Sequence, residues 1–232
     1  MPLVRSPNTH GFFIHIPKCA GTSITKSLVD INCALFLTNQ YRCGQIRDYR
    51  DYIVHDRWIP NREYPCSQQH WQADLINQFI NVNKLTFIFT MIRDPLDRIL
   101  SEYRFRKGAY CEAQNAQNWR QYDLGTYPNS RDQTDDFSLW LSKNYEAYLV
   151  NNYVWDNHFR PQSEFIVSNC SVFLYPYFEP VSDFIQEKIG RRPNMPYLNK
   201  SESYDIEVST KDRKLIEMWY NKDYELLEGA CK

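Results

Sequence analysis

FFIHIPKCAGTS (residues 12–23) and FIFTMIRDPLDRILS (residues 87–101) each begin as a short hydrophobic run and continue through a polar turn into a helix-forming segment. Short apolar runs rich in β-branched and aromatic residues are typical of buried strands in a parallel sheet. Each turn carries a cation and hydroxyl groups where a helix N-terminus would expose backbone N–H groups, which favours an anion. Two such turns in one small domain predict a ligand with two separate phosphate groups.

The first turn combines a charge, hydroxyl groups and a glycine. We expect Lys18 to supply the charge, Gly21 to permit a tight turn, and Thr22 or Ser23 to cap the following helix. The lysine precedes the glycine, so the segment is not a G-x-x-x-x-G-K-[ST] loop, which argues against an ordinary ATPase or GTPase. A merely structural strand–helix turn is the alternative. The predicted phosphate-binding residues are Lys18, Cys19, Ala20, Gly21, Thr22 and Ser23.

The second turn has a strong helix start. Asp94 is a good N-cap, Pro95 suits the first helical position, and Gly108 is expected to end the helix. The guanidinium of Arg93 and the hydroxyl of Ser101, two helical turns beyond Asp94, could bind a second phosphate from one side. Alternatively, Arg93 pairs with a carboxylate and Ser101 is solvated.

Hydrophobic spacing and capping residues predict the remaining elements. The expected elements are loops over 31–66 with a short strand near 52–55, a helix starting near His70, a helix from Thr134 or Asp135 followed by another over 145–154, strands over 164–167 and 172–175, a helix over 181–189 ended by Gly190, a helix from Ser209 or Thr210 to about Tyr220, and a short turn near 223–227. This alternation predicts an α/β, three-layer, P-loop-like fold with a central parallel sheet flanked by helices. We expect one domain over 1–232, with an insertion at about 110–157 that shapes an acceptor site.

Composition excludes several classes of protein. The 232 residues carry a net charge of -1, which gives no reason to expect nucleic-acid binding. No apolar run is long enough to span a bilayer, so we expect a cytoplasmic protein unless an anchor has been removed. Seven cysteines without a C-x-x-C pair favour free thiols over disulfides or a zinc site, and no other metal-ligand spacing is present.

The two motifs resemble the phosphate-binding signatures of sulfotransferases that use 3′-phosphoadenosine 5′-phosphosulfate (PAPS). In pattern they are most similar to the carbohydrate group that includes heparan-sulfate 2-O-sulfotransferases and their bacterial homologues. Weaker similarity extends to residues 69–71, 157–162 and 177–179, whereas 110–150 match no pattern known to us. The resemblance implies that the first motif binds the 5′-phosphosulfate end of PAPS and that the second binds its 3′-phosphate. Cys19 stands where many members have Thr or Ser.

The resemblance also implies a mechanism, in which an acceptor hydroxyl displaces 3′-phosphoadenosine 5′-phosphate (PAP) in line, without a metal. Lys18 would stabilise the leaving phosphate and His70 would act as the base, since an imidazole pKa near ~6.5 suits proton abstraction at neutral pH. His70 could instead be packed at a helix start. His55 and Asp56 are the fallback bases.

Other polar residues have less certain roles. His15 is expected to be packed behind the site, while His158 and Arg160 either line the acceptor site or support the fold. Lys200, with Ser201 and Ser203, could close over the 3′-phosphate as a late loop does in related enzymes, although the glycine of that loop is not evident here.

Three functions remain open at this point. The leading hypothesis is transfer of a sulfuryl group from PAPS to a hydroxyl, which we expect to be on a carbohydrate. A P-loop small-molecule kinase would need a Mg²⁺-binding carboxylate at a strand end and a lysine after the glycine. A non-catalytic PAP- or nucleotide-binding protein would keep Lys18, Arg93 and Ser101 without turnover.

Overall fold

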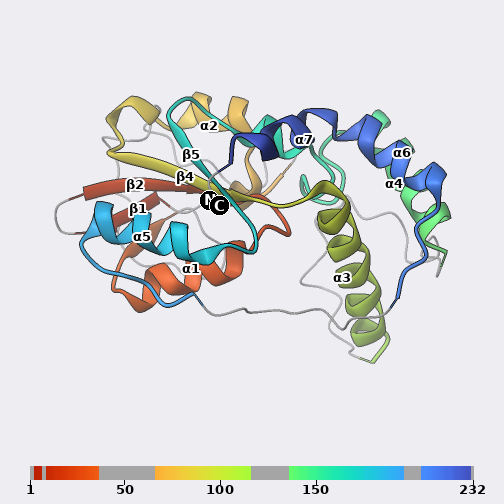
Figure 1. Cartoon of the computed structure of the whole chain (residues 1–232), viewed down its shortest axis with the longest axis horizontal. Coiled ribbons are helices and arrows are strands. Elements are labelled where there is room, and N and C mark those ends of the chain that lie inside the picture. Colours follow the sequence, from red (N-terminus) through yellow and green to blue (C-terminus); the bar gives the residue numbers. More distant parts are fainter. Residues whose placement is uncertain (1–2, 7–8, 37–65, 116–135, 196–204, 231–232) are drawn as a thin grey trace.

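A computed structural model describes residues 3–6, 9–36, 66–115, 136–195 and 205–230, with the side chains of 108–115 left out (Figure 1). Its centre is a five-stranded sheet in the order β3-β1-β2-β4-β5. The strands are β1 (Leu3–Ser6), β2 (Thr9–Ile14), β3 (Ala34–Phe36), β4 (Phe87–Ile92) and β5 (Cys170–Leu174). Strand β4 pairs in parallel with β2 on one side and with β5 on the other. Strand β1 is antiparallel to both β2 and β3.

The α/β class is therefore confirmed, but the expectation of a parallel sheet is only partly right, because one side of the sheet is antiparallel. Ser6 pairs with Thr9, so β1 and β2 form a hairpin, a connection that allows only antiparallel pairing. β3, which lies in the predicted loop region, extends this edge. Neither β1 nor β3 exceeds four residues, which is too short for a periodic signal.

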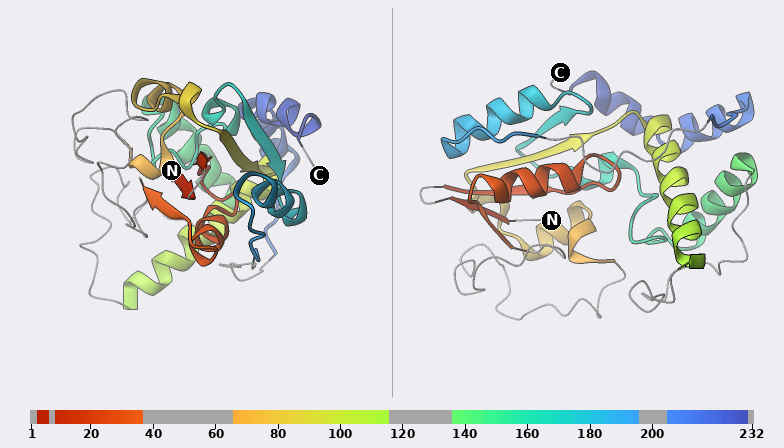
Figure 2. Two further views of the ribbon diagram at one scale, coloured as in Figure 1. Left: turned by 90° about the vertical axis from the view of Figure 1, so that its left-hand side faces the viewer. Right: turned by 90° about the horizontal axis from the view of Figure 1, so that it is seen from below.

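Helices cover both faces of the sheet (Figures 1 and 2). Helices α1 (Gly21–Asp30) and α5 (Phe178–Ile189) lie on one face, and α2 (Ala73–Phe79) and α7 (Asn221–Glu228) on the other. Alternating strand residues supply the two cores, as the period of a strand requires. Phe13 and Phe89 pack with α1 and α5, whereas Phe12 and Ile88 pack with α2.

A third core lies beyond the strand ends, where β4 leads into α3 (Figure 1). It joins α3 (Pro95–Asn115), α4 (Phe137–Val150), the loop between α4 and β5, and α6 (Thr210–Trp219). Its buried residues are mainly aromatic: Tyr103, Phe137, Trp140, Trp155, Phe159, Trp219 and Tyr220. Part of the predicted insertion, α4, thus packs directly against the helix that follows the second motif.

Several predicted boundaries are confirmed. The Asp94 side chain accepts a hydrogen bond from the Asp97 N–H, which caps α3. Ser209 and Asp212 form a capping box at the start of α6, and Gly190 ends α5 with φ of 79°.

Other boundaries are wrong. Helix α3 continues through Gly108 to Asn115, since an isolated glycine lowers helix stability by only about 1 kcal/mol. The two helices predicted from 134 to 154 are one helix, capped by Asp136. The predicted strand over 164–167 overlaps a 3-10 helix, Gln162–Phe165, and His70 ends a 3-10 helix, Gln68–His70, before α2 begins at Ala73.

The described residues also include a 3-10 helix at Val82–Lys84. No helix in the described part of the chain combines the length and hydrophobicity that crossing a membrane requires. The predicted strand near 52–55, the fallback bases His55 and Asp56, and Lys200, Ser201 and Ser203 lie outside the described residues.

Candidate active site

The turn after β2 reaches α1 through two left-handed residues. Lys18 has φ of 66° and Ala20, the N-cap, has φ of 61°. Alanine has no side-chain acceptor, so the N–H groups at the start of α1 are not capped by that residue. The prediction that Thr22 or Ser23 caps the helix is therefore wrong, because both already lie in its first turn. Left-handed non-glycine residues cost about 1–3 kcal/mol each and cluster at functional sites.

A glycine is needed at position 21 because the His15 ring packs closely against its backbone, and not because the turn requires an unusual backbone conformation. It lies inside α1, and a Cβ atom added there would lie 2.0 Å from Nε2 of His15. His15 is buried, and its ring stacks on Phe13 with 5.9 Å between centroids. The first turn thus packs directly on a buried imidazole, which the sequence analysis had placed behind the site.

Lys18 is largely desolvated. Its Nζ lies 3.9 Å from the ring centroid of Phe105 on α3, a cation–π contact. Burial lowers the pKa of the Lys18 ammonium, although the Glu102 carboxylate opposes this shift. Because little water surrounds Lys18, solvent would screen the attraction between its ammonium and an incoming anion only weakly.

The second turn presents Arg93 at the end of β4. Its guanidinium lies over the ring of Tyr175, with 4.6 Å from Cζ to the centroid. The Nε atom of Arg93 is buried, and no group among the described residues accepts a hydrogen bond from it. Such a donor is costly to leave unpaired, so it suits a ligand acceptor. Ser101 is also buried, on α3.

Gln162 joins the two turns. Its fully buried side-chain amide accepts a hydrogen bond from the Arg93 N–H at 2.9 Å and donates one to the Arg93 carbonyl at 2.8 Å. The same amide oxygen accepts from Sγ of Cys19 at 3.1 Å. Asp223 on α7 in turn accepts from the Gln162 N–H at 2.7 Å. One side chain therefore holds both turns in place.

Arg98 fixes the other side of the first turn. Its side chain is almost completely buried on α3 and donates to the carbonyl of Pro17 at 3.1 Å. Its other nitrogens donate to the carbonyls of His158 at 2.8 Å and Arg160 at 2.9 Å. The guanidinium thus connects the β2 turn to the loop that carries His158.

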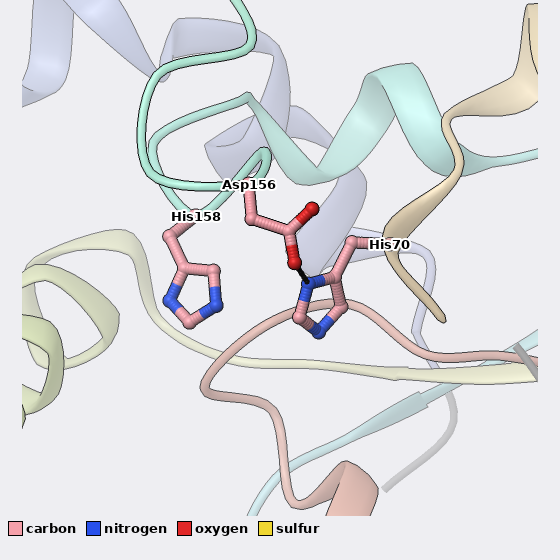
Figure 3. Close-up of side chains that lie close together, drawn as sticks. All are labelled: His70, Asp156 and His158. Atoms are coloured by element: carbon pink, nitrogen blue, oxygen red, sulfur yellow. Dashed lines mark hydrogen bonds and ion pairs between the residues drawn. The ribbon is translucent and has the colours of Figure 1, made fainter. Parts of the chain in front are cut away.

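His70 forms a dyad with Asp156 (Figure 3). The ring Nδ1 lies 2.7 Å from Oδ2 of Asp156, which also accepts from the Ser67 hydroxyl at 2.8 Å. Burial alone would raise the pKa of the Asp156 carboxyl. The positive charge and hydrogen bond of His70 and the N–H of Ser67 outweigh burial and hold that pKa below its usual range. Asp156 is thus an ionised partner for the histidine.

The backbone that carries Asp156 is left-handed over three consecutive residues, with φ of 55°, 58° and 66° at Trp155, Asp156 and Asn157. Side chains hold this unfavourable turn in place. Asn157 donates to the carbonyl of His70 at 2.8 Å, and Nε1 of Trp155 donates to Asn144 at 2.6 Å. Strain that is held so firmly beside an ionised dyad indicates a functional constraint.

His158 forms a second histidine–carboxylate pair. Its Nδ1 lies 2.9 Å from Oε2 of Glu102, whose other oxygen accepts from Nε of Arg106 at 2.6 Å. Burial lowers the pKa of His158 to about 4, although Glu102 opposes the shift. The pKa of the buried Glu102 carboxyl lies well below its usual value, because Arg106 and His158 outweigh its desolvation.

The three imidazoles contact one another edge to face. The ring centroids of His15 and His70 are 5.2 Å apart, and those of His70 and His158 are 4.9 Å apart. The Phe105 ring, which contacts Lys18, lies 6.4 Å from that of His158. The predicted base and the predicted cation therefore belong to one cluster of contacting side chains.

Arg160 has a different place. Its Nε donates to Asn157 at 3.0 Å, and its other nitrogens bond to Glu164 and to the carbonyl of Asn152. The guanidinium thus supports the loop, which was one of the two roles left open for it. Sequence reasoning missed Asp156, Glu102, Gln162 and Arg98. The stretch NHFRPQ, which includes Gln162, was noted, but nothing local distinguishes an amide that bridges two turns.

The fold and site define an α/β protein with two strand–helix turns, carrying Lys18 and Arg93, after adjacent parallel strands, and with a buried histidine–carboxylate dyad. Among models of protein families, the one described as "Sulfotransferase family" matches residues 1–228. The chain therefore belongs to the sulfotransferase family. Searches of curated proteins and of solved structures found no match.

Proposed function

We propose that this protein transfers a sulfuryl group from PAPS to a hydroxyl group of a carbohydrate. The turn at Lys18–Ser23 would bind the 5′-phosphosulfate, and Arg93 with Ser101 would bind the 3′-phosphate. In this proposal the fold is of the P-loop-like kind, in which a phosphate-binding turn connects a strand to a helix. The observation that carries the proposal is the Gln162 amide, which hydrogen-bonds to both turns and so ties two anion sites into one.

The residues present suit such a donor. The buried Nε of Arg93 offers an unused hydrogen bond, and a guanidinium matches the planar geometry of phosphate oxygens. The desolvated ammonium of Lys18 lies at the other turn, where α1 begins. Two separate cations at two turns fit a ligand with two phosphate groups better than a ligand with one.

The dyad suits proton abstraction. With Nδ1 of His70 bonded to Asp156, Nε2 would accept the proton of the acceptor hydroxyl while the hydroxyl oxygen attacks sulfur. The bond between sulfur and the bridging oxygen breaks at the same time, and that oxygen leaves with PAP. Lys18 would stabilise the negative charge that develops on it. Atoms and charges balance without a metal step.

A sugar acceptor is favoured by the surroundings of Lys18. Phe105 is 41% exposed, and its ring contacts Nζ of Lys18 and lies 6.4 Å from the ring of His158. The exposed part of this side chain would let an apolar part of a sugar pack beside the charged groups while a sugar hydroxyl reaches His70. The resemblance of the two motifs to the carbohydrate group of the family points the same way.

The decisive experiment is calorimetric titration of the protein with PAP and, in parallel, with AMP and ATP, without added metal. Preferential binding of PAP over AMP is expected, because only PAP occupies both turns. Sulfuryl transfer from PAPS is then assayed with a panel of glycans, lipids and tyrosine peptides, using His70→Ala as the inactive control. Equal affinity for PAP and AMP would contradict the donor assignment, and PAP binding without transfer to any acceptor would favour a non-catalytic binding protein.

A further inference from the structure

A third side chain, His158, lies close to the His70–Asp156 dyad, although an acid–base role for His70 does not require it. Each of the three residues offers one ligand atom, and these atoms all lie within 4.8 Å of one another. Figure 3 shows the Asp156 carboxylate pointing at Nδ1 of His70 and the His158 ring lying beside this pair, with the side chains coming from two separate segments of the chain. Two imidazoles and one carboxylate are the protein ligands of many catalytic-type zinc sites, which keep a fourth position for water.

Other residues hydrogen-bond to these side chains in the way that is usual for metal ligands. Ligating histidines usually bond through their other nitrogen to a carboxylate, which fixes the ring orientation. Nδ1 of His158 is held in this way by Glu102, so its Nε2 is the nitrogen left for a ligand. The Asp156 carboxylate is oriented by the backbone and hydroxyl of Ser67. The ligand atoms of His158 and Asp156 are therefore oriented before any ion binds, whereas an ion bound at Nδ1 of His70 must replace the proton that this nitrogen shares with Asp156.

We propose that His70, Asp156 and His158 form a binding site for a divalent transition metal, Zn²⁺ by ligand type, whose occupation inhibits the enzyme. Nitrogen and oxygen ligands in this mixture prefer Zn²⁺, Ni²⁺ or Cu²⁺ to Mg²⁺ or Ca²⁺, which prefer oxygen alone. The Asp156 and Glu102 carboxylates offset the charge of the ion, which enters a region that also holds Lys18 and Arg106.

Inhibition follows from the number of lone pairs. A neutral imidazole has one ring lone pair, and a metal bound to either nitrogen of His70 uses it. The bound histidine can then no longer accept a proton from an acceptor hydroxyl. This consequence rests on the proposed role of His70 as the base, whereas metal binding itself does not.

The test begins with protein freed of metal by a chelator and titrated calorimetrically with Zn²⁺ and, separately, with Mg²⁺. One Zn²⁺ per chain is expected, with no binding of Mg²⁺. Asp156→Asn and His158→Ala should each weaken Zn²⁺ binding by ~10-fold or more, and Glu102→Gln should weaken it by ~10-fold through the loss of ring orientation. His10→Ala, which removes an imidazole on β2 outside the cluster, should leave Zn²⁺ affinity unchanged.

Thiols are the main competing ligands, so the site is also loaded with Co²⁺. Absorption without a thiolate charge-transfer band is expected from nitrogen and oxygen ligands. PAP affinity and the unfolding curve of each variant show whether it is folded. Equal Zn²⁺ affinity in wild type and folded His158→Ala, or a thiolate band with Co²⁺, would overturn the site.

Inhibition is measured separately, as PAPS turnover with and without Zn²⁺ followed by chelation. Reversible loss of turnover in wild type is expected. Full turnover with Zn²⁺ bound would overturn the inhibitory half of the proposal. Zn²⁺ binding by a protein that transfers no sulfuryl group would instead refute the proposed function and leave the metal site standing.

Discussion

The Asp156 carboxylate determines which nitrogen of a neutral His70 ring carries the proton. Because Asp156 is ionised and accepts a hydrogen bond from Nδ1 at 2.7 Å, the neutral ring carries its proton there and leaves Nε2 free of it. Asp156 is in this sense a positioning residue for His70. It also stabilises the imidazolium that forms once the proton has been taken.

Asp156→Asn should lower turnover by ~10²-fold or more, because an amide can stabilise the wrong tautomer and carries no charge. PAP affinity should be unchanged, since neither phosphate turn contains Asp156. The measurement is kcat with saturating PAPS beside calorimetric PAP binding. Asp74→Asn, which alters an exposed carboxylate on α2, is the matched control. A full-rate Asp156→Asn enzyme would remove the dyad from the mechanism.

The adjacent positions Gly21 and Ala20 place different demands on their residues. Gly21 has helical backbone but no room for a side chain, whereas Ala20 has a left-handed backbone. Gly21→Ala places a methyl group 2.0 Å from Nε2 of His15, and the buried ring has little room to move. We expect the free energy of unfolding to fall by about 1–3 kcal/mol, the usual cost of overpacking. Turnover should also fall, because His15 contacts the ring of His70.

The control for this variant is Ala20→Gly, measured in the same urea titrations. Ala20 has φ of 61°, a conformation that glycine adopts without strain, so this change should not lower stability. Loss of stability in Ala20→Gly with none in Gly21→Ala would reverse the roles assigned to the two positions.

The 3-10 helix at Gln162–Phe165 acts as a connector between elements. Through Gln162 it binds the turn after β2 and the turn after β4, and through Asp223 it is attached to α7. The spacing of the two proposed phosphate-binding turns is thus set by a short segment that contains neither of them.

Gln162→Met keeps the volume of the side chain and removes its hydrogen bonds. The part-buried N–H and carbonyl of Arg93 would lose their Gln162 partners, at a cost of up to about 1–3 kcal/mol for each group left unsatisfied. PAP affinity should fall more than AMP affinity, because the second turn loses its support. Calorimetry with both nucleotides measures this ratio, with Gln78→Met on the exposed side of α2 as control. Equal losses for the two nucleotides would mean that Gln162 supports stability only.

Local signals explain which elements could be predicted. The strands at 12–14 and 87–92, the Asp94 cap and the end of α5 at Gly190 depend on neighbouring residues, so the sequence indicated them. Helix α3 passes Gly108 because a modest local penalty was not enough to end it. Lys18 and His70 could be proposed from motif position alone. Asp156 and Gln162 act across 86 and 69 residues of sequence, and no local pattern specifies such partners.

At the scale of the whole molecule, the sheet also shows which features local sequence patterns can predict and which they cannot. Its parallel half, β2-β4-β5, follows from strands alternating with helices, whereas the β1 hairpin and β3 depend on short edge strands whose pairing decides their structure. The proposed site lies at the ends of β2 and β4, next to all three cores of the molecule. Protonation of its buried groups therefore changes the stability of the whole fold.

Two buried histidines make global stability depend on pH. Burial lowers the pKa of His158 to about 4 and holds that of His15 well below its ordinary 6.5, so between these values the unfolded chain binds more protons than the folded one. Stability is then complete above pH 6.5 and is lost as pH falls toward 4, by about 1.4 kcal/mol per pH unit for each histidine. Asp156 and Glu102, whose folded pKa values are depressed, contribute stability that is lost only at lower pH.

Urea unfolding from pH 7.5 to 4.5 should therefore show a free energy of unfolding that is flat above pH 6.5 and then falls. His158→Gln removes one buried histidine, so its slope below pH 6.5 should be smaller than that of wild type by about 1.4 kcal/mol per pH unit, while His15 and His10, whose pKa values are also lowered, keep the rest. Its stability at pH 7.5 should be lower, because Glu102 loses the ring that it orients. A wild-type slope that survives this substitution would show that the protons bound on unfolding belong to other groups. Unchanged stability down to pH 5 would show that the buried histidines take up protons in the folded protein as they do in the unfolded chain, and the rings beside His70 would then become charged below about pH 6.5.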